Sequence, residues 1–278
     1  MEADPNHRTD PDVDDRALGS RTVVNDPGSM KSNMTNLTID IPALLLVGGK
    51  GTRLRSVVSS APKPMAAVGE QSFLELLVRQ LRSQGIRRLV MCSGYLAEQI
   101  EEKFGDGRAW DVSITYSREQ QPMGTGGAVK LAQSHLANES EFVVMNGDSF
   151  LEADFTQLVG FHRERKALAS LAVVPVEDAG RYGTVCVDTN RRVSGFTEKT
   201  GAGAPGLINA GVYVFNPSIF NHIPEGPASL EKDVFPRVLD RGVYALEQHG
   251  IFIDIGTPED YARAQVLCGQ LNDAACGK

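Results

Sequence analysis

Cysteine is scarce in this chain, with four residues among 278. No two of them form a C-x-x-C pair, and none has histidines at zinc-ligand spacing, which argues against a structural zinc site. Cys92 and Cys186 fall in predicted strands, where we interpret them as small buried hydrophobic residues. This cysteine usage fits a reducing, cytoplasmic location.

Positive charge and long apolar stretches are also lacking. The chain has 28 Lys and Arg against 35 Asp and Glu, a formal net charge of -7. Nucleic-acid backbones require clustered Lys and Arg, so no nucleic-acid partner is expected. No apolar stretch is long enough to span a bilayer, and the N-terminus lacks a secretory-signal pattern, so no membrane partner is expected either.

Histidine offers no recognisable catalytic pattern. The five histidines include no pair at i,i+3 or i,i+4 spacing. No Ser–His–Asp or Cys–His arrangement suggests itself, and covalent nucleophilic catalysis is therefore not indicated.

The first 36 residues differ in composition from the rest. They hold four Lys and Arg and seven Asp and Glu, but almost no large apolar residue. Such a segment cannot bury enough apolar surface to offset its ordering entropy, so residues 1–36 are expected to be a disordered extension. Residues 37–278 are expected to form one domain, because the chain is 41% hydrophobic and can bury a sizeable core.

Apolar runs and helical spacing alternate through the first half of the chain. Short apolar runs bounded by turn residues predict buried strands, and apolar residues at i, i+3 and i+4 predict helices. Strands are expected over 41–47, 86–92, 112–116 and 141–145, and helices over 73–81, 96–104 and 128–136. The first helix is expected to stop at Gly85. This alternation predicts a Rossmann-like α/β fold, with a mixed, mainly parallel sheet flanked by helices.

The second half has a different pattern, with few helices between short strands. These strands are expected over 171–176, 183–187, 192–197 and 210–215. We interpret 41–150 as a nucleotide-binding half, 151–261 as a smaller α+β half for the substrate, and 262–278 as a C-terminal helix and tail. No internal repeat is visible, so no C-terminal β-helix is expected.

A glycine-rich turn follows the first predicted strand. It runs Gly48-Gly49-Lys50-Gly51-Thr52-Arg53-Leu54, and Pro62-Lys63-Pro64 comes shortly after. Small residues at a strand end expose backbone N–H groups that can cradle phosphate oxygens. Arg53 adds a planar cation and Lys63 a point charge. Together they favour a polyphosphate site, although taken alone they also fit an ordinary glycine-rich turn.

Two familiar phosphate motifs do not match this turn. A P-loop requires G-x-x-x-x-G-K-[ST], but Gly51 is followed by Thr52-Arg53. A dinucleotide fingerprint requires G-x-G-x-x-G, and Leu54 stands where the third glycine belongs.

Later segments add a second loop and two isolated acids. Pro122–Ala128 is glycine-rich and directly precedes a predicted helix, whose N-terminus favours negative charge. Asp148 closes the fourth predicted strand, and burying an acid there is costly unless it meets a cation. Mg²⁺ is the natural candidate, since it takes oxygen ligands and shares them with phosphates. Asp254 is a second candidate ligand, because Thr257 is the better N-cap for the helix that follows.

The order of these motifs resembles that of the sugar-1-phosphate nucleotidyltransferases. G-G-x-G-T-R-L followed by P-K-P is similar to their signature, and further motifs follow in the family's order from about Ile41 to about Tyr261. The resemblance implies the GT-A-like fold of nucleotide-diphospho-sugar transferases. It also implies transfer of a nucleotidyl group from a nucleoside triphosphate to a sugar 1-phosphate, with Mg²⁺ held jointly by Asp148 and Asp254.

The resemblance also assigns roles to individual residues. Arg53 and Lys63 are the expected catalytic cations. The expected nucleotide-binding residues are Leu46, Gly48, Gly49, Gly51, Thr52, Gly94, Gly124, Thr125, Gly126 and Asp148. The expected sugar-phosphate-binding residues are Gly147, Tyr182, Gly183, Glu198, Lys199 and Asn209.

The first two motifs are most similar to those of D-glycero-α-D-manno-heptose 1-phosphate guanylyltransferases, which favours that sugar and GTP. Mannose 1-phosphate with GTP, and glucose 1-phosphate with UTP or dTTP, stay open, as does a non-catalytic nucleotide-sugar sensor. A retaining glycosyltransferase would usually show Asp-x-Asp at the metal strand, which Asn146-Gly147-Asp148 does not match. Val47 stands where the family more often has alanine, and its extra methyl groups are expected to touch the base. The resemblance leaves room for a homo-oligomer.

Overall fold

The computed structural model describes residues 39–54, 57, 61–197 and 203–278. All of them lie in the unit Leu37–Lys278. The predictions for residues 1–36 and for Glu198 and Lys199 fall outside the described residues.

A seven-stranded sheet forms the centre of the fold, in the order β12-β8-β11-β6-β1-β4-β5. Its strands are β1 (Ala43–Leu46), β4 (Arg88–Ser93), β5 (Ser113–Arg118), β6 (Phe142–Asn146), β8 (Ala169–Val176), β11 (Gly206–Phe215) and β12 (Val243–Glu247). β6, β1, β4 and β5 are parallel neighbours, and β12 is parallel to β8. Only β11 runs antiparallel to its two neighbours. The predicted mixed, mainly parallel sheet is confirmed.

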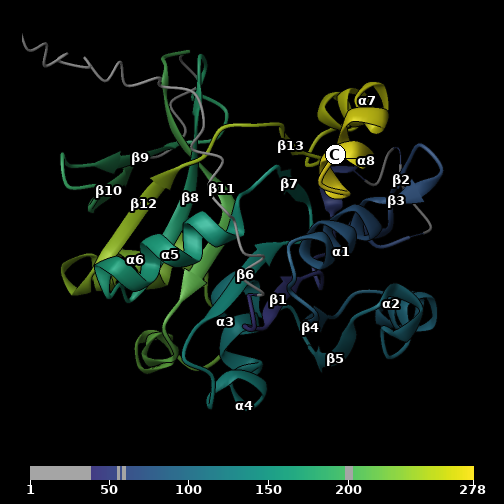
Figure 1. The fold of residues 1–278 in the computed structure, drawn as a ribbon, viewed down its shortest axis with the longest axis horizontal. Helices are drawn as coiled ribbons and strands as arrows, with labels where there is room; N and C mark the ends of the chain where they lie inside the picture. Colours follow the sequence, from purple (N-terminus) through teal and green to yellow (C-terminus); the bar gives the residue numbers. More distant parts are fainter. Residues whose placement is uncertain (1–38, 55–56, 58–60, 198–202) are drawn as a thin grey trace, which may run out of the picture. The chain divides into compact units, whose positions relative to one another are not determined.

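Helices cover both faces of this sheet (Figure 1). They are α1 (Phe73–Ser83), α2 (Ala97–Phe104), α3 (Gly124–Leu131), α4 (Gln133–Leu136), α5 (Phe155–Arg165), α6 (Phe235–Val238), α7 (Pro258–Val266) and α8 (Cys268–Ala275). Neighbouring strand residues point to opposite faces, so Leu45 and Met91 pack with α1, α2 and α5, whereas Leu44 and Val90 pack with α3, α4 and α6. A sheet buried on both faces explains why its inner strands are continuous apolar runs.

Local sequence signals set several element ends, and those at Gly85 and Thr257 were predicted. Ser72 caps α1 in a capping box with Glu75. Gly85, which follows the end of α1, has a φ of +87°, and this left-handed conformation suits glycine. Thr257 caps α7 by accepting the N–H of Asp260, with Pro258 as the first helical residue.

Short elements connect the main ones. The remaining strands are β2 (Ala67–Val68), β3 (Gln71–Ser72), β7 (Ser149–Leu151), β9 (Thr184–Val187), β10 (Val193–Thr197) and β13 (Phe252–Asp254). The remaining helices are the 3₁₀ turns η1 (Thr52–Leu54), η2 (Lys63–Met65), η3 (Arg108–Trp110), η4 (Pro217–His222) and η6 (Leu239–Arg241), and the π-helical turn η5 (Leu230–Val234).

The second half of the chain contributes strands β8, β11 and β12 to the same sheet. One prediction for this half is wrong. Cys186, interpreted as buried, is exposed, because its neighbour Val185 takes the inward position on β9.

The chain ends in α7 and α8, and α8 packs on α1. Among the described residues no β-helix follows Asp254. None of the described helices combines the length and apolar character needed to cross a membrane. The four cysteines are free.

Candidate active site

A cavity of about 400 Å³ opens at the carboxyl ends of β1 and β6. This is the edge of a parallel sheet where ligands bind in open α/β folds. Ten residues predicted from the sequence line it: Leu46, Gly48, Gly49, Gly51, Thr52, Arg53, Lys63, Gly124, Thr125 and Asp148. Its other lining residues are Lys50, Pro64, Glu119, Pro122, Ala128, Asn146 and Gly256.

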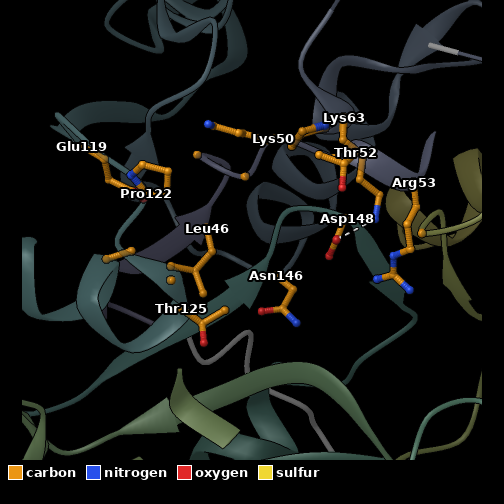
Figure 2. Close-up of a pocket in the computed structure, with 17 residues that line it drawn as sticks. Leu46, Lys50, Thr52, Arg53, Lys63, Glu119, Pro122, Thr125, Asn146 and Asp148 are labelled. Carbon is orange, nitrogen blue, oxygen red and sulfur yellow. Dashed lines mark hydrogen bonds and ion pairs between the residues drawn. The ribbon is translucent and has the colours of Figure 1, made fainter. Parts of the chain in front are cut away.

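The two ends of the cavity differ in charge (Figure 2). Glu119 and Pro122 lie on one side, and Lys63, Arg53 and Asp148 lie on the other. Leu46 lies between the two groups. The arrangement suits an elongated ligand with a neutral, hydrogen-bonding end and a polyanionic end.

The glycines of the first loop are required by their protein neighbours. A Cβ on Gly48 would lie 2.6 Å from Glu119 Oε1, and one on Gly51 would lie 2.6 Å from Lys63 Cβ. Gly51 also has a φ of +56°, which suits glycine. Gly94 does not line the cavity; a Cβ there would lie 3.0 Å from Gly48 O, so it supports the loop from behind. These glycines let Glu119 and Lys63 approach the loop closely.

The second glycine-rich loop packs against the segment around Ala228. A Cβ on Gly124 would lie 2.5 Å from Ala228 O. The N–H groups of Gly126 and Gly127 donate to Ala228 O at 2.8 and 3.1 Å. Thr125 lines the cavity, whereas Gly126 does not, and its predicted contact with nucleotide stays a prediction.

A two-stranded ribbon brings the two predicted metal ligands together. β13 pairs with β7 so that Asp254 lies opposite Ser149, next to Asp148 in sequence. The N–H of Ile255 donates to Asp148 O at 2.9 Å. Burial, and then the negative charge of Asp148, raise the pKa of Asp254 above its usual value.

Lys63 bridges these carboxylates. Its Nζ lies 2.7 Å from Asp148 Oδ2 and 3.7 Å from Asp254 Oδ1, and its side chain is only 9% exposed. Pro62 starts the 3₁₀ turn η2 that carries it. A buried ammonium is costly without anionic partners, and here it has two.

The residues present fit Mg²⁺. The two carboxylates are hard oxygen donors, and the buried Asp254 Oδ1 accepts no hydrogen bond from the described residues. No cluster of three or more His, Cys, Asp or Glu that could hold a metal occurs in the part of the chain that the structure describes. Mg²⁺ tolerates such a site because it usually keeps waters and substrate phosphates as its remaining ligands.

Two further cations line the cavity. Arg53 and Lys50 are exposed, and no hydrogen bond or ion pair joins either side chain to another described residue. The buried Leu54 anchors the 3₁₀ turn that carries Arg53. Both charges are therefore available to an anionic ligand.

Glu119 was missed by sequence reasoning. It directly follows β5 and lines the cavity on the side away from Arg53 and Lys63 (Figure 2). Its Oε2 accepts the N–H of Met123 at 3.0 Å, and burial raises its pKa. The sequence signal was an acid just after a predicted strand and just before the Pro122 loop.

The predicted sugar-phosphate residues that the structure describes, Gly147, Tyr182, Gly183 and Asn209, do not line this cavity. Gly147 packs on β1, since a Cβ there would lie 2.6 Å from Leu46 O. Tyr182 is half-buried against Phe252, and Gly183 has a φ of +80°. Asn209 lies on β11.

Val47 was expected to touch the base, but it does not line the cavity. It is fully buried in the core, because β1 alternates faces and presents Leu46 instead. The departure from alanine at Val47 therefore concerns core packing.

Comparison with known sequences agrees with this geometry. The sequence model of the nucleotidyl transferase family matches residues 42–270. This chain belongs to the nucleotidyl transferase family. The match covers both glycine-rich loops, both aspartates and Lys63.

Two relatives in this family are similar to the chain over most of the matched region. The chain is 41% identical over 225 residues to "D-glycero-alpha-D-manno-heptose 1-phosphate guanylyltransferase" of Aneurinibacillus thermoaerophilus, covering 80% of this chain and 96% of that one. It is 39% identical over 230 residues to "Mannose-1-phosphate guanylyltransferase" of Mycobacterium tuberculosis, covering 81% of this chain but only 64% of the relative's length.

A solved structure supports the fold. HddC from Yersinia pseudotuberculosis, crystallised in complex with GMP-PN, superposes with a TM-score of 0.72 at 32% identity. The comparison covers 81% of this chain and 98% of HddC.

Proposed function

We propose that this nucleotidyl transferase family member transfers a guanylyl group from GTP to a sugar 1-phosphate, releasing pyrophosphate. The observation that carries the proposal is the Lys63–Asp148–Asp254 cluster at a cavity that is also lined by Arg53 and Lys50, two cations with no ion pair to a described residue. The names of the relatives, both guanylyltransferases, support the choice of reaction.

The chemistry needs charge neutralisation more than a general base. A phosphate oxygen of the sugar 1-phosphate forms a bond to the α-phosphorus, and the bond from that phosphorus to the β-phosphate's bridging oxygen breaks. The nucleophile is already an anion, so repulsion between anions is the main barrier, and preorganised charges lower it. Arg53 and Lys50 would hold the departing pyrophosphate, and Lys63 would neutralise the α-phosphate.

Asp148 and Asp254 would hold Mg²⁺. When bound, the metal supplies positive charge that stabilises the phosphate oxygens. Lys199 is proposed to bind the phosphate of the sugar, with Glu198, Tyr182, Gly183 and Asn209 near its hydroxyls. The cytoplasmic location and a homo-oligomer stay predictions.

Glu119 supports guanine as the base. A carboxylate only accepts hydrogen bonds, and guanine presents the N1–H and N2–H donors side by side. Uracil and thymine place an acceptor next to their one N–H donor, which a carboxylate would repel. Glu119 Oε1 has no hydrogen bond from a described residue, so it is free to accept one.

Exchanging this acceptor is expected to change base selectivity. In Glu119→Gln, the amide keeps an oxygen for Met123 but turns an N–H toward guanine. The ratio of kcat/KM for GTP to that for UTP should fall about tenfold to hundredfold, the effect typical of one hydrogen bond to a charged group. Parallel rate measurements check it, with Glu98→Gln, an exposed helix residue paired with Arg118, as the control. An unchanged ratio would remove Glu119 from base recognition.

The sugar is proposed to be D-glycero-α-D-manno-heptose 1-phosphate, with mannose 1-phosphate as the second candidate. The heptose relative is covered over 96% of its length, which favours it, while the mannose relative is nearly as similar in sequence. Pyrophosphate release should be measured with Mg²⁺, crossing GTP, UTP and dTTP with heptose, mannose and glucose 1-phosphates. Turnover confined to GTP and one manno-configured sugar is expected. If no pair releases pyrophosphate, the proposed function is wrong, and the result favours the alternative of a non-catalytic nucleotide-sugar sensor.

A further inference from the structure

A chain of side-chain hydrogen bonds runs from β11 to the start of α3. Asn209 Nδ2 donates to Tyr213 Oη at 2.8 Å, and Tyr213 Oη donates to Glu231 Oε1 at 3.1 Å. Thr125 Oγ1 donates to Glu231 Oε2 at 3.3 Å. The chain thus joins Asn209, on the proposed sugar side, to Thr125, which lines the nucleotide cavity.

Glu231 fixes the direction of these bonds. A carboxylate accepts only, so the one proton of Tyr213 must point toward it. Complete burial and the charge of Glu231 raise the pKa of Tyr213 well above its usual value, so this hydroxyl keeps its proton. The tyrosine oxygen then has only lone pairs left for Asn209, which must present its NH₂ group. Asn209 Oδ1 correspondingly accepts the N–H of Gly211 at 3.0 Å.

Asn209 lies at the start of an irregular stretch of backbone. β11 is bulged: Asn209 lies opposite Val173 and Tyr213 opposite Leu171, so four steps along β11 match two along β8. Bulges of this kind redirect side chains beside active sites. Gly211 within the bulge has a φ of +74°, and a Cβ there would lie 2.5 Å from Asn146 Nδ2.

The segment that carries Glu231 is itself fastened to the nucleotide loop. Glu231 lies in the π-helical turn η5, a rare element often found at functional sites. Leu230 N donates to Thr125 Oγ1 at 2.8 Å, and Ser229 Oγ donates to Glu231 Oε2 at 3.0 Å. Both carboxylate oxygens are therefore engaged, one toward each side of the site.

We propose that Glu231 is a positioning residue that orients Asn209 through Tyr213 for the sugar 1-phosphate and holds Thr125 for the nucleotide. This inference rests on the proposed function and deepens it. It assigns Glu231 no contact with the reacting atoms. The hydrogen bonds of Glu231 have two arms, one through Tyr213 to Asn209 and one to Thr125. Removing the first should raise KM for the sugar 1-phosphate, and removing the second should raise KM for GTP.

Three variants separate the arms. Tyr213→Phe keeps the ring contacts with Phe215 and Phe235 but removes the bond to Asn209. It should raise KM for the sugar 1-phosphate about tenfold, roughly one hydrogen bond, and leave KM for GTP within about twofold. Glu231→Met should raise both KM values, because it also releases Thr125. Glu231→Gln keeps one acceptor, for Tyr213, so KM for the sugar 1-phosphate should stay at the wild-type value. KM for GTP should stay raised, because an NH₂ group replaces the acceptor that Thr125 and Ser229 use.

A matched control and the wild type complete the test. Tyr116→Phe removes a comparable hydroxyl bond, to Gly105 O at 2.8 Å, outside the cavity, and should change neither KM. If Tyr213→Phe and Glu231→Met lower the melting temperature but leave both KM values unchanged, these hydrogen bonds serve stability alone and the inference is overturned. Absence of transfer by the wild-type protein would instead overturn the proposed function, and the inference with it.

Discussion

Replacing Lys63 with methionine is expected to lower the rate of nucleotidyl transfer by about 10²–10³-fold, the usual loss when one preorganised charge is removed. Lys63 is nearly buried and pairs with both Asp148 and Asp254. Methionine has a similar length but leaves the two carboxylates facing each other without a counter-charge. Steady-state kcat/KM at saturating Mg²⁺ measures the loss.

The same variant separates the two roles of this lysine. Without Mg²⁺ its melting temperature should fall below that of the wild type, because a buried ion pair has lost one partner. Added Mg²⁺ should raise it by more than in the wild type, since Lys63 no longer competes for the carboxylates. Lys103→Met, which breaks an ion pair with Glu75 outside the cavity, is the control and should keep the wild-type rate. A wild-type rate in Lys63→Met would contradict the assignment.

Replacing Arg53 with alanine is also expected to reduce the rate about 10²–10³-fold, but without a cost in stability. Arg53 is exposed, and its side chain has no ion pair or hydrogen bond to another described residue. The folded protein therefore loses no contact, whereas the departing pyrophosphate loses a cation. The rate of nucleotidyl transfer and the melting temperature should be measured on the same variant. The rate should fall, and the melting temperature should stay at the wild-type value.

Arg53→Lys refines this prediction. It keeps the charge but loses the planar fork that binds two phosphate oxygens at once, so an intermediate rate is expected. Arg108→Ala, at a position 91% exposed and away from the cavity, should match the wild type. An Arg53→Ala rate within about threefold of the wild type would mean that Lys50 or another group holds the leaving pyrophosphate.

The inner strands of the sheet were predictable because burial on both faces leaves an unambiguous signal. The runs 41–47, 86–92 and 141–145 became β1, β4 and β6, with ends shifted by one or two residues. The glycine-rich motifs were also predictable, because residues close in sequence define them. Gly51, for example, adopts a positive φ that suits glycine and leaves no room for a Cβ beside Lys63.

Long-range pairing was not predictable from local pattern. That β8, β11 and β12 join the first-half sheet depends on contacts between distant segments. α5 was missed because Gly160 and the polar end of the helix dilute its apolar spacing. The three-residue strand β7 is too short to recognise, although its pairing with β13 brings Asp148 and Asp254 together.

The site was predictable where its chemistry lies in contiguous motifs and not where it depends on tertiary partners. Glu231 lies 106 positions from Thr125, so no spacing rule connects them. The glycines of the second loop were expected to admit a ligand, and all three, Gly124, Gly126 and Gly127, also admit the Ala228 segment. Only the packed structure distinguishes these reasons.

The central claim is that a phosphate oxygen of the sugar 1-phosphate attacks the α-phosphorus of GTP. It is tested most directly with mannose and manno-heptose 1-phosphates that carry ¹⁸O at the bond between sugar and phosphate, with mass spectrometry of the products. The account predicts a GDP-sugar that retains ¹⁸O, and unlabelled pyrophosphate. A GDP-sugar without the label, or label released as inorganic phosphate, would contradict it, because the sugar–oxygen bond would then have been broken.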